Sequence, residues 1–324
     1  MKIKTMNKEI KKAIDGWIHS LPEIPGVSKF EIQDSVMVTG GCIASMFLGT
    51  EVNDFDVYFT DYDVAKKVFQ MYADQTKGKL VCSEADLKMH VSPDANLNDI
   101  IDFSTILDKK TTDDDDDEMR EVFNKVDKDK PLFFYTQEDA KEKRIKFFYQ
   151  SVGVYKKKTK KAYAPVFISS NAVTLNNQIQ LINRFIGPVE EIHKNFDFVH
   201  CTNYWTYRNG VVTNKKALEA LLSRELIYVG SRYPLASVIR TRKFIKRGFN
   251  ICAGEYVKMA LQINTFDLKN VYTLSDQLMG VDLVYFDMFL RSLVKYYESN
   301  KEIEMTMVYR MLDEVFHDDE IAEE

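Results

Sequence analysis

Two glycines and two aspartates form the part of the chain with the clearest chemical meaning. Gly40 and Gly41 are followed, after a spacer of twelve residues, by Asp54-Phe55-Asp56. In an extended strand, residues two apart point to one face, so the two carboxylates should project together, ~6–7 Å apart along the backbone. Paired carboxylates repel unless a cation lies between them, and Mg²⁺ prefers oxygen ligands. Glycines allow a phosphate to approach the backbone, and helix N–H groups can bind it. The combination predicts phosphoryl or nucleotidyl transfer; a tight turn before an exposed acidic edge is the alternative.

The flanking residues indicate which elements must position this chemistry. Val36 to Val38 is a short apolar run that predicts a strand leading into the glycines. A helical turn should follow, and then a second strand that carries the aspartates. In that strand Phe55, Val57 and Phe59 alternate with the acidic positions, so we expect them to face a core.

The segment resembles the signature of the DNA polymerase beta nucleotidyltransferase superfamily, and especially its tRNA CCA-adding and poly(A) polymerase branch. The residues in register with that branch are Gly40, Gly41, Ile43, Leu48, Gly49, Asp54 and Asp56. Ala44-Ser45 replaces the Arg-Asp pair of the branch. Of its downstream Arg-Arg-Asp-Phe-Thr-x-Asn-Ala stretch, this chain keeps Asn171-Ala172 and lacks the arginines.

The resemblance implies an α+β fold: a polymerase-beta-like core, with a small mixed sheet and helices, plus a helical C-terminal domain. It implies Mg²⁺ (or Mn²⁺) as cofactor and a nucleoside triphosphate (NTP) as substrate. It also implies a third carboxylate on a strand beside the Asp-x-Asp strand. Asp197 is the candidate, in an apolar segment from Phe196 to Cys201 that we expect to be a strand; an exposed aspartate on an edge strand or turn is the alternative.

These implications assign roles to individual residues. The catalytic and metal-binding residues are expected to be Asp54, Asp56 and Asp197. The nucleotide-binding residues are expected to be Gly40, Gly41, Ser45 and Asn171, together with Arg240, Lys243 and Arg247. The last three come from a basic stretch, residues 230–250, that contains no acidic residue. At helical spacing they line one face, which suits phosphates or RNA; pairing with an acidic segment of the chain is the alternative.

Composition indicates how the chain is organised. Its 324 residues, 45% hydrophobic, predict two domains: a catalytic domain over 1–205 with an insertion at about 61–162, and a helical domain over 206–324. The insertion holds the acidic run Asp113 to Asp117, whose role the sequence does not indicate. The net charge of −5 means that RNA affinity must come from local patches. Four dispersed cysteines, and the lack of a signal peptide or long apolar run, favour a cytoplasmic protein without membrane contact.

Other classes of enzyme lack support in the sequence. The chain has no C-x-x-C pair for zinc, no phosphate-binding lysine loop and no G-x-G-x-x-G pattern. We therefore expect transfer of a nucleoside monophosphate from an NTP to a hydroxyl, most naturally an RNA (tRNA) 3′ end, with release of pyrophosphate. Transfer to a protein or to another nucleotide is the alternative, and a catalytically silent RNA-binding protein is a third. The order of segments also resembles phage-type nucleotidyltransferases, which would place the protein in a host cytoplasm. The preferred NTP, the use of a template and the oligomeric state are not indicated.

Overall fold

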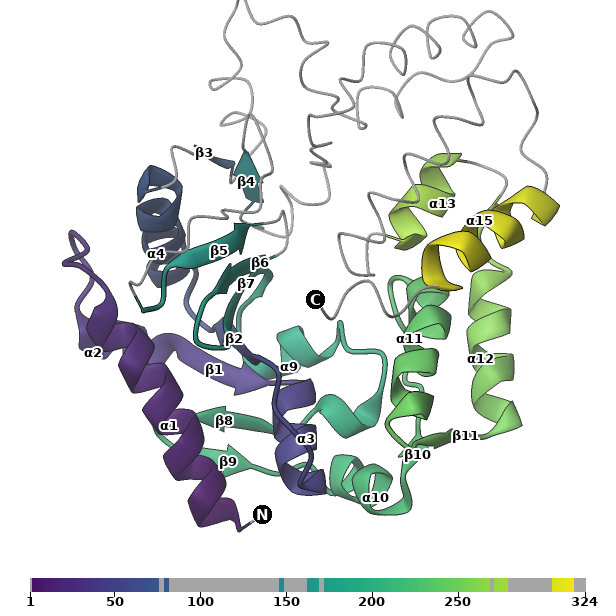
Figure 1. Cartoon of the computed structure of the whole chain (residues 1–324), viewed down its shortest axis with the longest axis horizontal. Helices are drawn as coiled ribbons and strands as arrows, with labels where there is room; N and C mark the ends of the chain where they lie inside the picture. The colour runs from purple at the N-terminus through teal and green to yellow at the C-terminus, as the bar shows by residue number, and fades with distance from the viewer. Residues whose placement is uncertain are drawn as a thin grey trace, which may run out of the picture. The chain divides into compact units, whose positions relative to one another are not determined.

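The computed structural model describes residues 2–75, 79–81, 146–148, 162–168, 172–268, 271–278 and 305–317. The chain divides into two compact units (Figure 1). The first consists of Met1–Lys109, Val126–Lys194 and His200–Leu221, and the second of Lys110–Lys125, Asn195–Val199 and Leu222–Glu324. Within the described ranges, no helix combines the length and apolar character needed to cross a membrane.

Helices and strands alternate in the first unit, whereas the second is mainly helical. The helices are α1 (Ile3–Ser20), α2 (Lys29–Ser35), α3 (Gly41–Leu48), α4 (Tyr62–Gln75), α9 (Val189–His193), the 3₁₀ helix η2 (Val199–Cys201), α10 (Lys215–Ser223), α11 (Pro234–Lys246), α12 (Ala253–Ile263), α13 (Val271–Leu278) and α15 (Met305–His317). The strands are β1 (Val36–Thr39), β2 (Phe55–Phe59), β3 (Lys79–Val81), β4 (Lys146–Phe148), β5 (Pro165–Ile168), β6 (Ala172–Leu175), β7 (Ile179–Ile186), β8 (Tyr204–Thr206), β9 (Gly210–Val212), β10 (Glu225–Leu226) and β11 (Asn250–Ile251).

A seven-stranded mixed sheet in the order β5-β6-β7-β2-β1-β8-β9 organises the first unit (Figure 1). β2 pairs with β1 in antiparallel fashion and with β7 in parallel fashion. The remaining neighbours in this sheet are antiparallel. The predicted α+β class with a mixed sheet is therefore confirmed.

Helices α1 and α4 cover the apolar face of the sheet because each presents a buried stripe. In α1 this stripe is Met6, Ile10, Ile14 and Trp17, spaced three or four residues apart as helical periodicity requires. The Trp17 indole donates a hydrogen bond of 3.0 Å to the Tyr72 hydroxyl of α4. This contact satisfies the polar atoms of both rings inside the core, where an unpaired group would be costly.

Helix α4 lies at the start of the predicted insertion, residues 61–162, yet it contributes to the core of the first unit. Ala65, Val68, Phe69 and Tyr72 are buried in the same apolar cluster as the sheet. The Phe69 ring also meets the Phe59 ring of β2 edge-on, with centroids 5.3 Å apart. The acidic run from Asp113 to Asp117 lies outside the described residues.

The prediction of a strand from Phe196 to Cys201 is wrong. The segment forms a bend followed by the 3₁₀ helix η2, and its one β-type contact is an isolated bridge between Phe198 and Tyr228. The alternating Phe-Asp-Phe pattern is typical of a strand. Here, however, the backbone hydrogen bonds between residues 197–199 and 227–229 form only that one bridge, because the chain turns into η2 at Val199.

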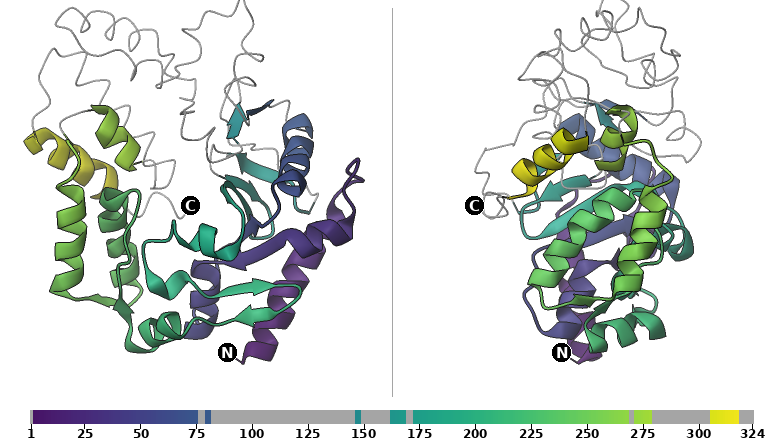
Figure 2. Two further views of the ribbon diagram at one scale, coloured as in Figure 1. Left: turned by 180° about the vertical axis from the view of Figure 1, so that it is seen from behind. Right: turned by 90° about the vertical axis from the view of Figure 1, so that its right-hand side faces the viewer.

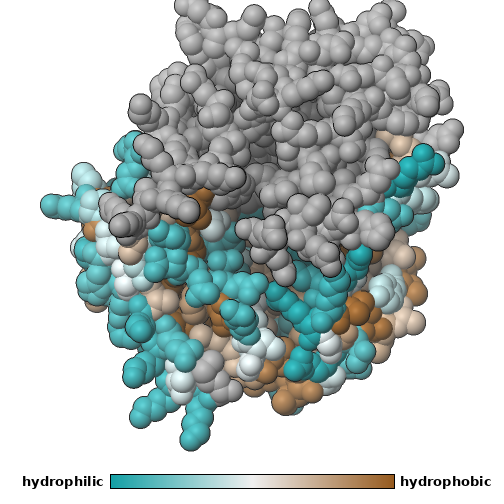
Figure 3. Space-filling view, viewed as in Figure 1, coloured by the Kyte–Doolittle hydropathy of each residue, from teal (hydrophilic) through white to brown (hydrophobic). Residues whose placement is uncertain are grey.

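The second unit contains helices α11, α12, α13 and α15. Figure 2 shows α11 and α12 side by side, and their residues are in contact. On α12, three large apolar side chains are exposed: Tyr256, Val257 and Leu261. Figure 3 shows brown apolar patches within an otherwise largely hydrophilic described surface.

Candidate active site

The glycine pair forms the turn between β1 and α3. Gly40 has φ 94° and ψ −147°, a conformation open almost only to glycine. Its N–H donates to the Cys201 carbonyl, with N and O 3.2 Å apart, which ties the turn to η2. A side chain introduced at Gly41 would meet no heavy atom within 4 Å among the described residues. The turn is therefore rigid at Gly40 and open at Gly41, where the first N–H groups of α3 begin.

Of the two aspartates predicted on one strand, only Asp56 lies within β2. Asp56 is half-buried in β2, and Asp54 is exposed one residue before the strand. Phe55, Val57 and Phe59 belong to the buried core cluster. Because side chains alternate along a strand, Asp56 projects from the face opposite this core.

The glycine turn and the acidic strand come together in space. Val38 of β1 is opposite Val57 of β2, so Thr39 and the glycines follow level with Asp56 and Asp54. Cys42, in the first turn of α3, reports the same proximity. Burial raises the pKa of its thiol above the usual range, and the nearby Asp56 carboxylate raises it further. The Asp56 charge therefore acts directly on the first turn of α3.

A second network holds the end of β1. The Thr39 hydroxyl lies 2.9 Å from the Asn203 carbonyl oxygen and 2.9 Å from Nε2 of His193. The Cys201 carbonyl oxygen is also near, at 3.3 Å. Carbonyls can only accept, so the single hydroxyl proton points to these oxygens and His193 Nε2–H donates to Thr39. Burial lowers the pKa of His193 to about 4, which keeps the imidazole neutral at neutral pH. His193 also stacks edge-on against Tyr204 of β8, with centroids 5.9 Å apart.

On the other side of Asp56, polar side chains continue across the sheet. Asp56 is the register partner of Gln180 on β7, and Gln180 is the partner of Thr174 on β6. Gln180 Nε2 donates to the Thr174 hydroxyl at 3.2 Å. The neighbours Leu181 and Val173 are buried in the core cluster, so this polar row lies on the face opposite the core.

The remaining predicted nucleotide-binding residues of the first unit differ in position. Ser45 is buried within α3, and its backbone carbonyl accepts the Thr50 N–H at the end of the helix. Asn171 lies outside the described residues.

Asp197 and the basic residues belong to the second unit. Asp197 is 8% exposed, and its carboxylate forms an ion pair of 3.1 Å with Arg240 Nε of α11. Lys243 and Arg247 are exposed at the C-terminal end of α11. Cations at this end of a helix also complement its dipole, so their position fits a structural role as well as phosphate binding.

The donor set of the first unit suits a hard cation but is small. Asp54 and Asp56, two positions apart at the start of β2, offer carboxylate oxygens, which are the ligands that Mg²⁺ and Mn²⁺ prefer. In the described ranges, no group of three or more acidic, histidine or cysteine side chains could hold a metal ion. The carboxylate pair would need oxygen ligands of another kind to complete a coordination shell.

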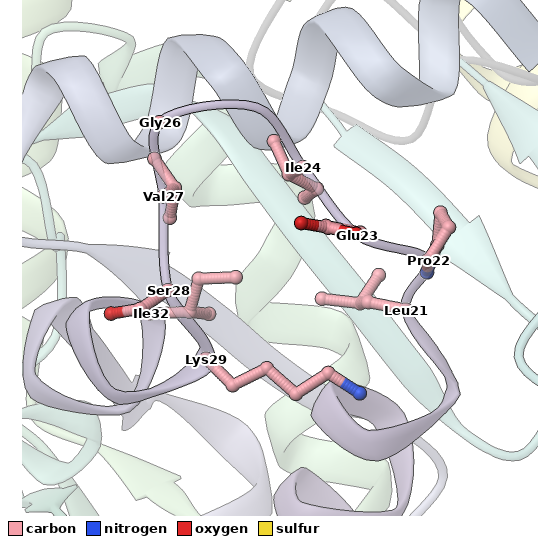
Figure 4. Close-up of a pocket in the computed structure, with 9 residues that line it drawn as sticks. All are labelled: Leu21, Pro22, Glu23, Ile24, Gly26, Val27, Ser28, Lys29 and Ile32. Carbon is pink, nitrogen blue, oxygen red and sulfur yellow. The ribbon is translucent and has the colours of Figure 1, made fainter.

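A pocket of about 530 Å³ lies elsewhere in the first unit, at the loop between α1 and α2 (Figure 4). Leu21, Ile24, Val27 and Ile32 supply much of its lining, and Glu23 and Lys29 are its charged residues. The Lys29 ammonium donates to the His19 carbonyl at 2.9 Å. With a single carboxylate, this pocket does not match the chemistry of the Asp54 and Asp56 site.

Four site residues were missed by sequence reasoning: Thr39, Cys42, Gln180 and His193. The alternation of Ile179, Gln180 and Leu181 predicts which face Gln180 takes. It does not predict that Asp56 is its neighbour. No local pattern pairs Thr39 with His193, because 154 positions separate them in the chain.

Comparison with protein families finds one matching family, described as Gabija anti-defense 2 family protein, whose match covers residues 8–224. Comparison with curated proteins finds no match.

Among solved structures, similar chains are CCA-adding enzymes. The Bacillus stearothermophilus CCA-adding enzyme in complex with CTP is 12% identical with a TM-score of 0.38, over 87% of this chain and 51% of that one. The Thermotoga maritima CCA-adding enzyme complexed with tRNA_CCA is 10% identical with a TM-score of 0.40, over 91% and 54%. A further CCA-adding enzyme with CTP is 11% identical with a TM-score of 0.42, over 98% and 65%. The match thus spans about half the length of the first of these proteins.

Proposed function

The chain belongs to the Gabija anti-defense 2 family, and from this we propose that it is a metal-dependent nucleotidyltransferase. Its activity would counteract the Gabija defence. One observation carries the proposal. In the register of β1 with β2, the open turn at Gly41 and the first N–H groups of α3 follow level with residues Asp54 and Asp56. Phosphate-binding N–H groups beside a carboxylate pair are what nucleotidyl transfer requires.

In the proposed reaction, the triphosphate binds at the turn, with Gly40 and Gly41 allowing close approach of the backbone. Ser45 and Asn171 are further proposed contacts. Asp54 and Asp56 would hold Mg²⁺ or Mn²⁺, which supplies charge neutralisation at the phosphates when bound. The acceptor hydroxyl oxygen bonds to the α-phosphorus while the bond between that phosphorus and its bridging oxygen to the β-phosphate breaks. Pyrophosphate leaves, and the hydroxyl proton passes to a carboxylate or water.

The acceptor has two candidates, each supported by a different observation. An RNA 3′ end, most naturally of tRNA, follows from the resemblance of the glycine and aspartate pattern to the CCA-adding branch. Arg240, Lys243 and Arg247 would contact its phosphates. A protein hydroxyl is the second candidate, because the family's name specifies action against a defence and so makes a component of that defence a natural target.

The test is Mg²⁺-dependent incorporation from each of four α-labelled NTPs into two acceptor pools. One pool is total small RNA, and the other is the purified components of the Gabija defence. Wild type should label one pool, and the Asp54→Asn/Asp56→Asn protein should label neither. Label in RNA or in protein identifies the acceptor. RNA binding with no label in either pool, and with the NTPs left intact, would contradict the proposal and favour a silent RNA-binding protein.

Asp197 is the proposed third carboxylate, and its ion pair with Arg240 makes that role testable in the same assay. If Asp197 acts on the acceptor, Asp197→Asn abolishes incorporation at every acceptor concentration. Arg240→Gln, which loses a proposed phosphate contact, then weakens acceptor binding but retains turnover at saturating acceptor. If the ion pair only holds residues 195–199 against α11, both variants lose stability by a similar amount, on the order of 1–3 kcal/mol for a buried partner left unpaired. Urea unfolding of the two variants and of the double variant separates these outcomes.

A further inference from the structure

The polar row beside Asp56 bears on how a cation would be bound. Asp56, Gln180 and Thr174 are successive register partners on β2, β7 and β6. Gln180 therefore lies between a carboxylate and a hydroxyl on one face of the sheet. Neighbouring strands lie about 4.8 Å apart, a spacing at which side chains of this length can share one ion.

The hydrogen bond to Thr174 orients the Gln180 amide. Its Nε2 donates to the Thr174 hydroxyl at 3.2 Å. The amide nitrogen and oxygen diverge from one planar carbon, so with the nitrogen bound on the β6 side the Oε1 faces away from β6. Because β2 is the other neighbour of β7, this leaves the oxygen on the side of β7 where Asp56 lies.

Neither strand that flanks β2 offers an acidic side chain as a further ligand. β1 reads Val-Met-Val-Thr and β7 reads Ile-Gln-Leu-Ile-Asn-Arg-Phe-Ile, without an acidic residue in either. The carboxylate pair needs further oxygen ligands, and the register places an amide oxygen beside it. Carbonyl oxygens of amide side chains are ordinary ligands of Mg²⁺-like cations.

We propose that Gln180 is a neutral oxygen ligand of the cation held by Asp54 and Asp56. This inference rests on the proposed function. Asp54 and Asp56 then contribute two negative charges to this cation, and Asp197, proposed to act on the acceptor, adds none to its coordination. Without NTP, the protein binds the cation weakly. When NTP is bound, the triphosphate oxygens add negative charge around the cation. Cation binding is therefore strongly coupled to NTP binding.

Mn²⁺ binding to the full-length protein tests the proposal independently of turnover. The signal of free Mn²⁺ in electron paramagnetic resonance gives the dissociation constant, with and without a non-hydrolysable NTP. Gln180→Glu should bind Mn²⁺ about tenfold more tightly without NTP, because a charge replaces a dipole at ligand distance. Gln180→Met, similar in length but without the oxygen, should bind at least about threefold more weakly with NTP. Asn209→Asp, which adds the same charge on the exposed turn between β8 and β9, should change neither value.

The outcomes separate this inference from the proposed function. Wild-type affinity in both Gln180 variants, with binding lost in Asp54→Asn/Asp56→Asn, overturns the role of Gln180 alone. Absence of Mn²⁺ binding by wild type, even with the nucleotide, overturns the metal site and with it the proposed function. Thermal unfolding of each variant monitors folding, and if Gln180→Met does not fold, the tightening in Gln180→Glu decides the question.

Discussion

At the scale of single residues, the two adjacent glycines have different physical roles. Gly40 is required by its own backbone, since φ 94° would strain any residue with a side chain by about 1–3 kcal/mol. Gly41 has no such requirement, and a methyl group there meets no described atom within 4 Å. Neither backbone conformation nor packing requires glycine at position 41. The open space beside it is therefore available to a ligand.

We therefore predict that Gly41→Ala leaves stability within about 0.5 kcal/mol of wild type or slightly raises it, since alanine favours helices. The same variant should lose NTP affinity at least about tenfold, because the methyl group occupies the space into which a phosphate must come. Nucleotide binding by calorimetry and unfolding in urea measure the two effects. Gly254→Ala, near the start of α12 and equally open, is the matched control and should affect neither. Unchanged NTP affinity in Gly41→Ala would place the phosphates elsewhere.

At the scale of elements, a histidine links α9 to the strand that leads into the glycine turn. His193 donates to Thr39, the last residue of β1, and its imidazole is half-buried against Tyr204. Burial lowers its pKa to about 4, below the ordinary value of 6.5. The folded state thus holds the neutral ring, whereas the unfolded chain takes up a proton as the pH falls below 6.5.

This difference makes stability depend on pH with a defined sign. The contribution of His193 is fully present above pH 6.5 and is lost as the pH falls toward 4. His193→Gln keeps a donor for Thr39 but cannot titrate. We predict that wild type loses roughly 1 kcal/mol more stability than His193→Gln between pH 7 and pH 5, after allowance for solvent screening. Urea unfolding at the two pH values measures this, and equal losses would show that His193 is not held neutral.

At the scale of the whole molecule, the net negative charge disfavours general binding of RNA. The net charge is −5, while the end of α11 carries exposed Lys243 and Arg247. If RNA binds there, its affinity must come from these local cations and must depend on salt.

We predict that Lys243→Glu/Arg247→Glu lowers RNA affinity and reduces the slope of log K against log salt by about 1.4, as expected for two lost contacts to single-stranded RNA. Fluorescence anisotropy with a short RNA over a range of salt concentrations provides the measurement. Lys8→Glu/Lys12→Glu on α1 has the same spacing and charge change on another exposed helix. If that control weakens RNA binding as strongly, the effect is one of overall charge and not of α11.

The sequence by itself determined the local parts of this protein. Gly40 to Asp56 lie close together in the chain, and their periodicity was enough to predict β1, α3 and β2 in order. The stripe of α1 and the basic end of α11 are local in the same sense, because a helix repeats its own pattern. The length of β7, which runs to Ile186, was less accessible, since its last residues do not alternate cleanly.

Only the tertiary structure decided which distant segments meet. β7 is the parallel neighbour of β2 although more than a hundred residues separate them, and this register places Gln180 beside Asp56. Asp197, in a segment whose pattern is typical of a strand, instead forms an ion pair with Arg240 in the second unit. Strand pairing between remote segments depends on how whole faces pack, and a charge takes the partner that packing brings near. Local periodicity predicts neither the strand pairing nor the partner of the charge. The neighbours of the carboxylate pair could therefore be identified only from the folded chain.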